Sequence, residues 1–129
     1  MLPDWRIDFQ AGRSGFSGLT YPAEKRIVIY VRSSQSDDLL AHVVAHEIGH
    51  AVDVGLNSSD DRRRWQAARE IEGIAWWPSR DAAPDTAVGV GDFAEAFADW
   101  QVGTGHFRSQ IAGRPDAADR ALLAELSRG

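Results

Sequence analysis

The chain has 129 residues, which is enough for a single domain with one hydrophobic core, and residues 1–129 are predicted to form one domain. Hydrophobic residues make up 43% and charged residues 26% of the chain, and no apolar run reaches the roughly 20 residues that a transmembrane helix needs. The net charge of −5 argues against a nucleic-acid partner, and the absence of cysteine excludes disulfides, thiolate metal sites and a cysteine nucleophile.

The first third of the chain is predicted to form short β-strands. Residues 5–9 alternate apolar and polar side chains, and residues 19–21, which follow several glycines, are expected to form a short second strand. Residues 26–31 are rich in β-branched and aromatic side chains, which favours a strand. Pro22 marks the turn between the last two strands.

A long helix is predicted after these strands. Ser36 precedes two aspartates, a pattern that is typical of an N-cap with acids in the first helical turn. Apolar residues then recur at helical spacing up to Val52, and Gly55 is the expected end of the helix.

Three further helices are expected in the rest of the chain. They are predicted over residues 60–71, from Asp92 onward, and after Pro115, and residues 73–91 are predicted to be a long loop. Within that loop, two adjacent tryptophans, Trp76 and Trp77, favour one core residue and one residue at the rim of a pocket. Because strands come first and helices follow, the chain is predicted to be an α+β domain.

Residues 46–50, His-Glu-Ile-Gly-His, match the pattern H-E-x-x-H within the first predicted helix. Histidines four residues apart project from one helix face, so His46 and His50 can bind a single ion. Glu47 lies beside that face, where it can take a proton from a metal-activated water. The motif therefore predicts Zn²⁺ as the cofactor and Glu47 as the general base. The alternative is that both histidines are ordinary helix residues with local hydrogen bonds.

Another histidine, His42, lies one helical turn before His46. His42 and His50 are separated by roughly 12 Å along a helix axis, so they cannot bind the same ion. A rival pair of His42 and His46 lacks a glutamate at the required offset. We therefore expect His42 to be structural or to lie at the rim of the site.

A catalytic zinc site needs a third protein ligand, which must be His, Asp or Glu in a chain without cysteine. The metzincin pattern is excluded because Asp53 and Leu56 stand where it requires Gly and His. Glu95 and Asp99 lie four residues apart on the third predicted helix, among alanines and other apolar residues. If Glu95 bound a zinc ion and Asp99 accepted a hydrogen bond from a ligand imidazole, these contacts would offset the cost of burying two carboxylates. The alternative is an amphipathic helix with two solvated acids.

The two motifs together resemble the gluzincin metallopeptidases, in which H-E-x-x-H is followed on a later helix by E-x-x-x-D or E-x-x-x-E. Residues 46–53 and residues 95–99 are also similar to the catalytic domain of anthrax lethal factor, and the small size is similar to that of minimal gluzincins and of the anti-repressor peptidases of mobile elements. The resemblance implies a small zincin-like domain, with a short N-terminal β-sheet, an active-site helix and further helices. It also implies that the strand of residues 25–32 forms the rim of the cleft and pairs with extended substrate.

The same resemblance implies a role for each site residue. His46, His50 and Glu95 would be the zinc ligands. Asp99 would orient a ligand histidine, and Asp53 would either do the same or be an exposed helix acid.

Lethal-factor-like enzymes carry a tyrosine upstream of the third ligand that stabilises the oxyanion, and residues 81–94 of this chain contain none. His106 is the candidate for that catalytic role, and its alternative is a loop residue without one.

These patterns predict a zinc-dependent endopeptidase that acts on peptide or protein substrates, with neither a nucleic-acid nor a membrane partner. Two alternatives are a regulatory or toxin-type peptidase specific for one protein partner and a non-catalytic zinc-binding domain; the presence of Glu47 counts against the second. Residues 1–6 show no signal-peptide pattern, which favours the cytoplasm, or secretion if the chain is a trimmed piece.

Overall fold

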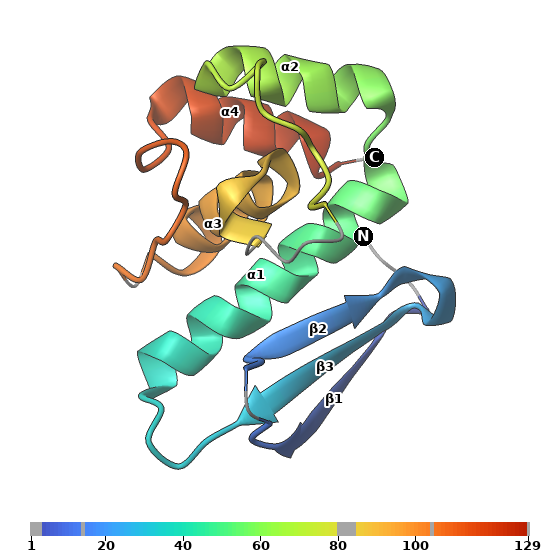
Figure 1. Ribbon diagram of the computed structural model, residues 1–129, viewed down its shortest axis with the longest axis vertical. Helices are drawn as coiled ribbons and strands as arrows, with labels where there is room; N and C mark the ends of the chain where they lie inside the picture. The colour runs from blue at the N-terminus through green and yellow to red at the C-terminus, as the bar shows by residue number, and fades with distance from the viewer. Residues whose placement is uncertain (1–3, 14, 80–84, 104, 129) are drawn as a thin grey trace.

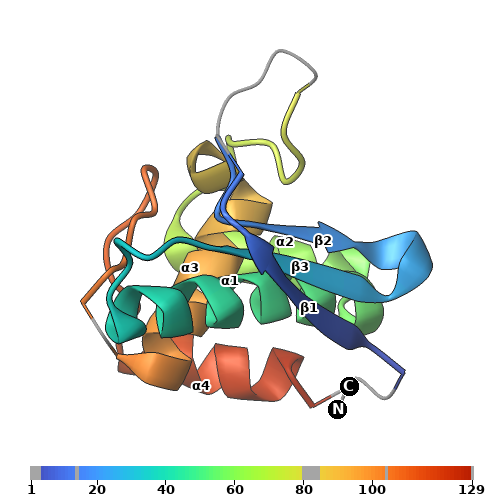
Figure 2. The same cartoon turned by 90° about the horizontal axis from the view of Figure 1, so that it is seen from below.

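The computed structural model describes residues 4–13, 15–79, 85–103 and 105–128 (Figure 1). Within them the chain forms a three-stranded sheet and four α-helices, which confirms the predicted α+β class. The sheet covers one side of the longest helix, and the remaining helices pack on its other side (Figure 2). No helix in the described part of the chain combines the length and the apolar character needed to cross a bilayer.

The sheet has the strand order β1-β3-β2, so β3 is central. β1 (Arg6–Ala11) runs parallel to β3 (Arg26–Val31), and β2 (Gly18–Tyr21) runs antiparallel to it. Because β3 is hydrogen-bonded on both edges, it has no free edge for an added strand. The prediction that residues 25–32 pair with substrate is therefore wrong, and β2 is the edge strand that lies next to the long helix.

The long helix is α1 (Asp37–Leu56), and it begins where the sequence predicts. The Ser36 side chain caps it by accepting a hydrogen bond from the backbone N–H of Leu39 at 3.1 Å. The predicted end at Gly55 is one residue too early, because Leu56 is still helical and Asn57 is the C-cap.

The other elements are η1 (Pro22–Glu24), α2 (Ser59–Arg69), η2 (Asp85–Ala87), α3 (Gly89–Val102) and α4 (Ala117–Leu126). Helix α3 starts three residues before the predicted Asp92, inside the predicted loop of residues 73–91; residues 80–84 of that loop lie outside the described residues. Of the two tryptophans, Trp76 is buried and Trp77 is half exposed, as predicted.

Two apolar clusters lie on opposite sides of α1. On the sheet side, Ile27 and Ile29 of β3 pack against Val43 and neighbouring side chains of α1. On the other side, Trp65 of α2 packs edge-to-face against Phe93 of α3, with ring centroids 5.3 Å apart. Helix α1 is thus held from both sides, which fixes the direction in which its histidines point.

Helices α1 and α3 approach closely at Gly49, inside the H-E-x-x-H motif. A Cβ atom at Gly49 would lie 3.0 Å from the Cα of Ala94, so a larger residue would require the two helices to move apart by a few tenths of an ångström. The contact places Glu95, the next residue of α3, beside the histidine face of α1.

Two buried ion pairs, both made by Arg69, join the three shorter helices. Arg69 donates from Nε and Nη2 to the two oxygens of Asp92, both at 2.9 Å, and from Nη1 to Asp119 at 3.0 Å. The side chains of Arg69 and Asp92 are almost completely buried. The forked guanidinium therefore links the ends of α2, α3 and α4 in one fixed arrangement.

Candidate metal centre

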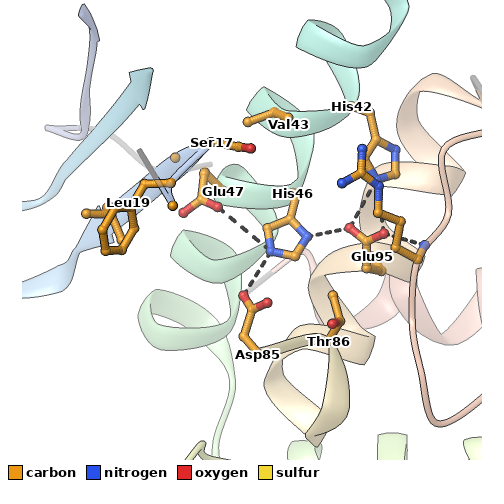
Figure 3. A pocket seen from close by; sticks show the side chains of 13 residues that line it. Ser17, Leu19, His42, Val43, His46, Glu47, Asp85, Thr86 and Glu95 are labelled. Carbon is orange, nitrogen blue, oxygen red and sulfur yellow. Dashed lines mark hydrogen bonds and ion pairs between the residues drawn. The ribbon is translucent and has the colours of Figure 1, made fainter. Parts of the chain in front are cut away.

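Three donor atoms from two separate segments of the chain, α1 and η2, lie within about 3 Å of one another. The Nε2 atoms of His46 and His50 are 3.0 Å apart, and Oδ2 of Asp85 lies 3.1 Å from the first and 2.8 Å from the second. The histidines meet because they are one helical turn apart on α1. Figure 3 shows Asp85 pointing from η2 toward His46. These three side chains form a group that could hold a metal ion.

The Asp85 backbone is held against the first turn of α3. A Cβ atom at Gly91 would lie 1.9 Å from the Asp85 carbonyl oxygen, so this contact requires glycine. Gln110 adds a second restraint, since its backbone N–H donates to the carbonyl of Thr86 at 2.9 Å and its side chain donates to the Thr86 hydroxyl at 3.1 Å. The Asp85 carboxylate therefore has a defined position, although 37% of its side chain is exposed.

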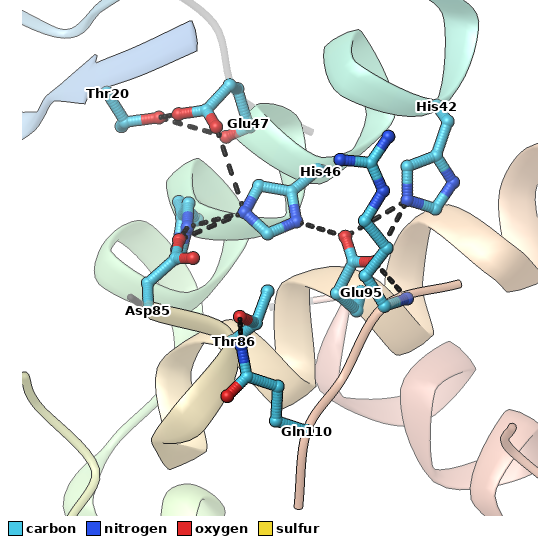
Figure 4. A network of polar contacts seen from close by, with 10 residues as sticks. Thr20, His42, His46, Glu47, Asp85, Thr86, Glu95 and Gln110 are labelled. Carbon is cyan, nitrogen blue, oxygen red and sulfur yellow. Dashed lines mark hydrogen bonds and ion pairs between the residues drawn. The ribbon is translucent and has the colours of Figure 1, made fainter. Parts of the chain in front are cut away.

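Glu47 lies next to this group and is buried. The Thr20 hydroxyl of β2 donates to its Oε1 atom at 2.9 Å, and its Oε2 atom lies 3.8 Å from Nε2 of His46 (Figure 4). The strand thus fixes one carboxylate oxygen and leaves the other directed at the His46 nitrogen that faces the metal-ligand group.

Glu95 contacts the opposite edge of the same imidazole. Its Oε2 atom lies 2.6 Å from Nδ1 of His46, and both of its oxygens lie within 3.1 Å of Nε2 of His42. The backbone N–H of Arg108 donates to Oε1 at 2.6 Å. Glu95 is thus fully hydrogen-bonded on the Nδ1 side of His46, and the structure brings Asp85, not Glu95, to the two Nε2 atoms.

These contacts shift the protonation of the group. Burial lowers the pKa of His46, but its hydrogen bonds to Asp85 and Glu95 outweigh burial and raise it to about 10. Burial raises the pKa of Glu95, but its hydrogen bonds to His42 and His46 lower it to about 2. The pKa of Asp85 is also held well below its usual range, because its hydrogen bonds to both histidines outweigh burial. Both carboxylates are therefore charged at neutral pH.

The structure places the two acids that were predicted to orient a ligand histidine, Asp99 and Asp53, away from His46 and His50. Asp99 lies one turn beyond Glu95 on α3, with Oδ1 3.1 Å from Nη2 of Arg114. Asp53 is fully buried and accepts hydrogen bonds from Arg62 and Trp76, both at 3.1 Å. Neither reaches His46 or His50 among the described contacts, and the contact expected of Asp99 is made by Glu95.

His106 is half-buried and faces His42 instead of the metal ligands. The two rings meet edge-to-face with centroids 6.0 Å apart. No hydrogen bond joins His106 to His46, His50 or Asp85 among the described residues. The catalytic role expected of His106 therefore stays a prediction.

Two cavities flank the three donor atoms. A cavity of about 430 Å³ lies on the side of His42 and Glu95, and one of about 270 Å³ lies on the side of His50. Both are bordered by Glu47 and by β2, so together they follow the edge strand past the candidate metal position. The half-exposed ring of Trp77 lines the smaller cavity, at the rim position that the sequence predicts.

The three donors fit a divalent metal ion. Ligand atoms of a tetrahedral zinc ion, with bonds of about 2.0–2.1 Å, are separated by about 3.3 Å. The observed separations of 2.8–3.1 Å are close to this value. Two imidazoles and one carboxylate are also a ligand set of catalytic zinc sites, which leave a further position for water.

Sequence reasoning missed Asp85 because no local pattern marks it. It is one of 19 acidic residues and lies 35 positions from His50. The two glycines that begin α3 were one available signal, since such positions allow another segment to approach closely.

Comparisons of the chain with protein-family models, curated proteins and solved structures found no match. A functional interpretation therefore depends on the geometry of the side chains described above.

Proposed function

We propose that this chain is a zinc-dependent peptidase of zincin-like fold, with His46, His50 and Asp85 as the metal ligands. The observation that carries this proposal is the close triangle of two Nε2 atoms and one carboxylate oxygen, with the Glu47 carboxylate beside it. The proposal keeps the gluzincin-like motif on α1 but replaces Glu95 with Asp85 as the third ligand.

A bound zinc ion supplies a Lewis acid that lowers the pKa of a coordinated water and polarises a carbonyl group. Glu47 would accept the water proton and pass it to the leaving amine. The Thr20 hydroxyl supports this role, because it holds Oε1 of Glu47 and leaves Oε2 near Nε2 of His46.

Glu95 would prepare His46 to bind the ion. A carboxylate can only accept a hydrogen bond, so Nδ1 of His46 must donate to it. In the neutral imidazole this leaves the lone pair on Nε2, which faces Asp85 and His50. The sequence motif on α3 thus serves the site through the orientation of a ligand histidine.

An extended peptide is the substrate that fits the surroundings. β2 is an edge strand, so its outer backbone groups are available to pair with another extended segment. Because the two cavities lie on either side of the metal position along β2, a peptide bound there could place one side chain in each.

Metal analysis and hydrolysis assays of one variant set test this proposal. We expect about one zinc per chain in the wild type, loss of zinc in His46→Ala, and retained zinc with no peptide hydrolysis in Glu47→Gln. Glu72→Gln, which changes an exposed glutamate, is the matched control and should behave as the wild type.

The outcomes separate the competing interpretations. Two histidines and one carboxylate also suit Fe(II), so the identity of the metal is part of the result. Zinc binding without hydrolysis that depends on Glu47 would contradict the peptidase and favour a non-catalytic zinc domain. Hydrolysis of one protein but of no member of a mixed peptide library would favour the partner-specific enzyme.

A further inference from the structure

An arginine, Arg108, borders the larger of the two cavities beside the candidate metal position. Arg108 lines it together with His42, Glu95 and the apolar residues Phe16 and Val43, and no other lysine or arginine borders it among the described residues. The other ionisable neighbours are the three carboxylates and two histidines already described. Among the described residues, Arg108 is therefore the one permanently charged cation that borders this cavity.

The main chain of Arg108 is anchored to the site, whereas its side chain is exposed. Its backbone N–H donates to Oε1 of Glu95 at 2.6 Å, which ties the position of its Cα atom to the group that orients His46. The guanidinium itself makes no hydrogen bond or ion pair with another described residue. Along the described chain, only Arg108 and Arg128 have a guanidinium without such a partner.

The carboxylates near Arg108 are already committed to other partners. Glu95 is hydrogen-bonded to His42 and His46, Asp85 to both ligand histidines, and Glu47 to Thr20. The guanidinium thus remains available to a molecule that enters the cavity. Its planar fork matches a carboxylate through two parallel hydrogen bonds, and a carboxylate is the anion that a peptide carries.

We propose that Arg108 binds a carboxylate of the substrate, so that the enzyme prefers peptides with an α-carboxylate or an Asp or Glu side chain in the cavity on the His42 side. This inference rests on the proposed peptidase function and adds a substrate class to it. It makes Arg108 a specificity-determining residue, since removing its charge should change which peptides bind, and leave metal binding unchanged.

Peptide binding to the zinc-loaded Glu47→Gln variant tests the inference without turnover. One pair of peptides differs only in a free C-terminal carboxylate or a C-terminal amide. A second pair, both amidated, differs only in an internal Glu or Gln. Affinities are measured by calorimetry in the Glu47→Gln background and after addition of Arg108→Gln, Arg108→Lys or Arg128→Gln.

We expect the carboxylate member of one pair to bind more tightly, and Arg108→Gln to weaken its binding about 10- to 100-fold, the range for a hydrogen bond to a charged group. Arg108→Lys should keep part of this preference, because lysine retains the positive charge but cannot make the two parallel hydrogen bonds of a guanidinium. Arg128→Gln should have no effect, and all variants should hold the same amount of zinc. The pair that shows the preference tells whether the carboxylate is terminal or on a side chain.

Equal affinities within both pairs would overturn the inference, and so would a carboxylate preference that persists in Arg108→Gln, since the metal ion alone would then account for it. Either result leaves the proposed function intact if the wild type still hydrolyses peptides in a manner that depends on Glu47. Failure of the proposed function has a different signature, which is the absence of any hydrolysis by the zinc-loaded wild type.

Discussion

Glu95 and His46 are joined on the imidazole edge that faces away from the candidate metal position, with Oε2 of the carboxylate 2.6 Å from Nδ1 of the ring. This contact separates two roles that a carboxylate can have near a metal ion. A ligand must reach the ion itself, whereas a carboxylate on Nδ1 sets the tautomer and orientation of the histidine that does.

We expect Asp85→Asn and Glu95→Gln to differ in their effect on zinc affinity. Loss of a carboxylate that only orients a ligand histidine costs about 10- to 100-fold in affinity, and loss of a direct ligand should cost more. Competition with a chromophoric chelator measures the zinc affinity of each variant. A larger loss in Glu95→Gln than in Asp85→Asn would contradict the assignment of Asp85 and restore Glu95 as the third ligand.

Zinc affinity should rise with pH between about pH 6 and pH 8. Because contacts with Asp85 and Glu95 raise the pKa of His46 to about 10, the imidazole carries a proton at neutral pH that the metal must displace. The apparent dissociation constant should therefore fall about tenfold or more per pH unit, and binding should release at least one proton. Calorimetry in buffers of different ionisation enthalpy counts the protons, and a pH-independent affinity would contradict the prediction.

Gly91→Ala should disturb the metal centre through the backbone. The new Cβ atom would meet the Asp85 carbonyl oxygen at 1.9 Å, so the η2 segment would have to move. We expect a loss of about 1–3 kcal/mol in the free energy of unfolding, typical of overpacking, and weaker zinc binding. Gly73→Ala is the matched control because a Cβ atom at Gly73 would meet nothing within 4 Å. Unchanged zinc affinity in Gly91→Ala would contradict the claim that this backbone contact positions Asp85 for metal binding.

Arg69→Met should destabilise the fold without involving the metal centre. It leaves the buried carboxylate of Asp92 without its ion-pair partner, a change that costs about 3–5 kcal/mol. Urea denaturation of the metal-free protein measures the loss. Arg63→Ala removes an exposed ion pair and should change stability by less than about 1 kcal/mol. Similar small losses in both variants would contradict the importance of the buried network.

The regular elements were predictable where local signals agreed. The bounds of β3 were predicted correctly because a run of β-branched and aromatic residues ends at polar and turn residues on both sides. The start of α1 followed from Ser36 and the acids after it. The start of α3 was missed because Gly89 and Gly91 are poor helix formers. Glycine stands at these positions because Trp76 approaches the first one closely and Asp85 approaches the second.

The site was predictable only in its local part. The spacing of His46 and His50 brings their imidazoles together on one helix, and the structure agrees. Spacing along α3 could place Glu95 near these histidines, but it could not tell which ring nitrogen the carboxylate would meet. Asp85 reaches the site through tertiary packing alone, so its identification needed the fold.

The unequal exposure of the three proposed ligands has a kinetic consequence. The side chains of His46 and His50 are 11% and 14% exposed and are held by a helix that is packed on both sides, whereas that of Asp85 is 37% exposed. An ion would therefore arrive and depart past the aspartate. The rate at which the Asp85 carboxylate dissociates from the ion would then set the lifetime of the metal-bound state. The two imidazoles would keep their positions in the metal-free protein and could bind the next ion without rearrangement.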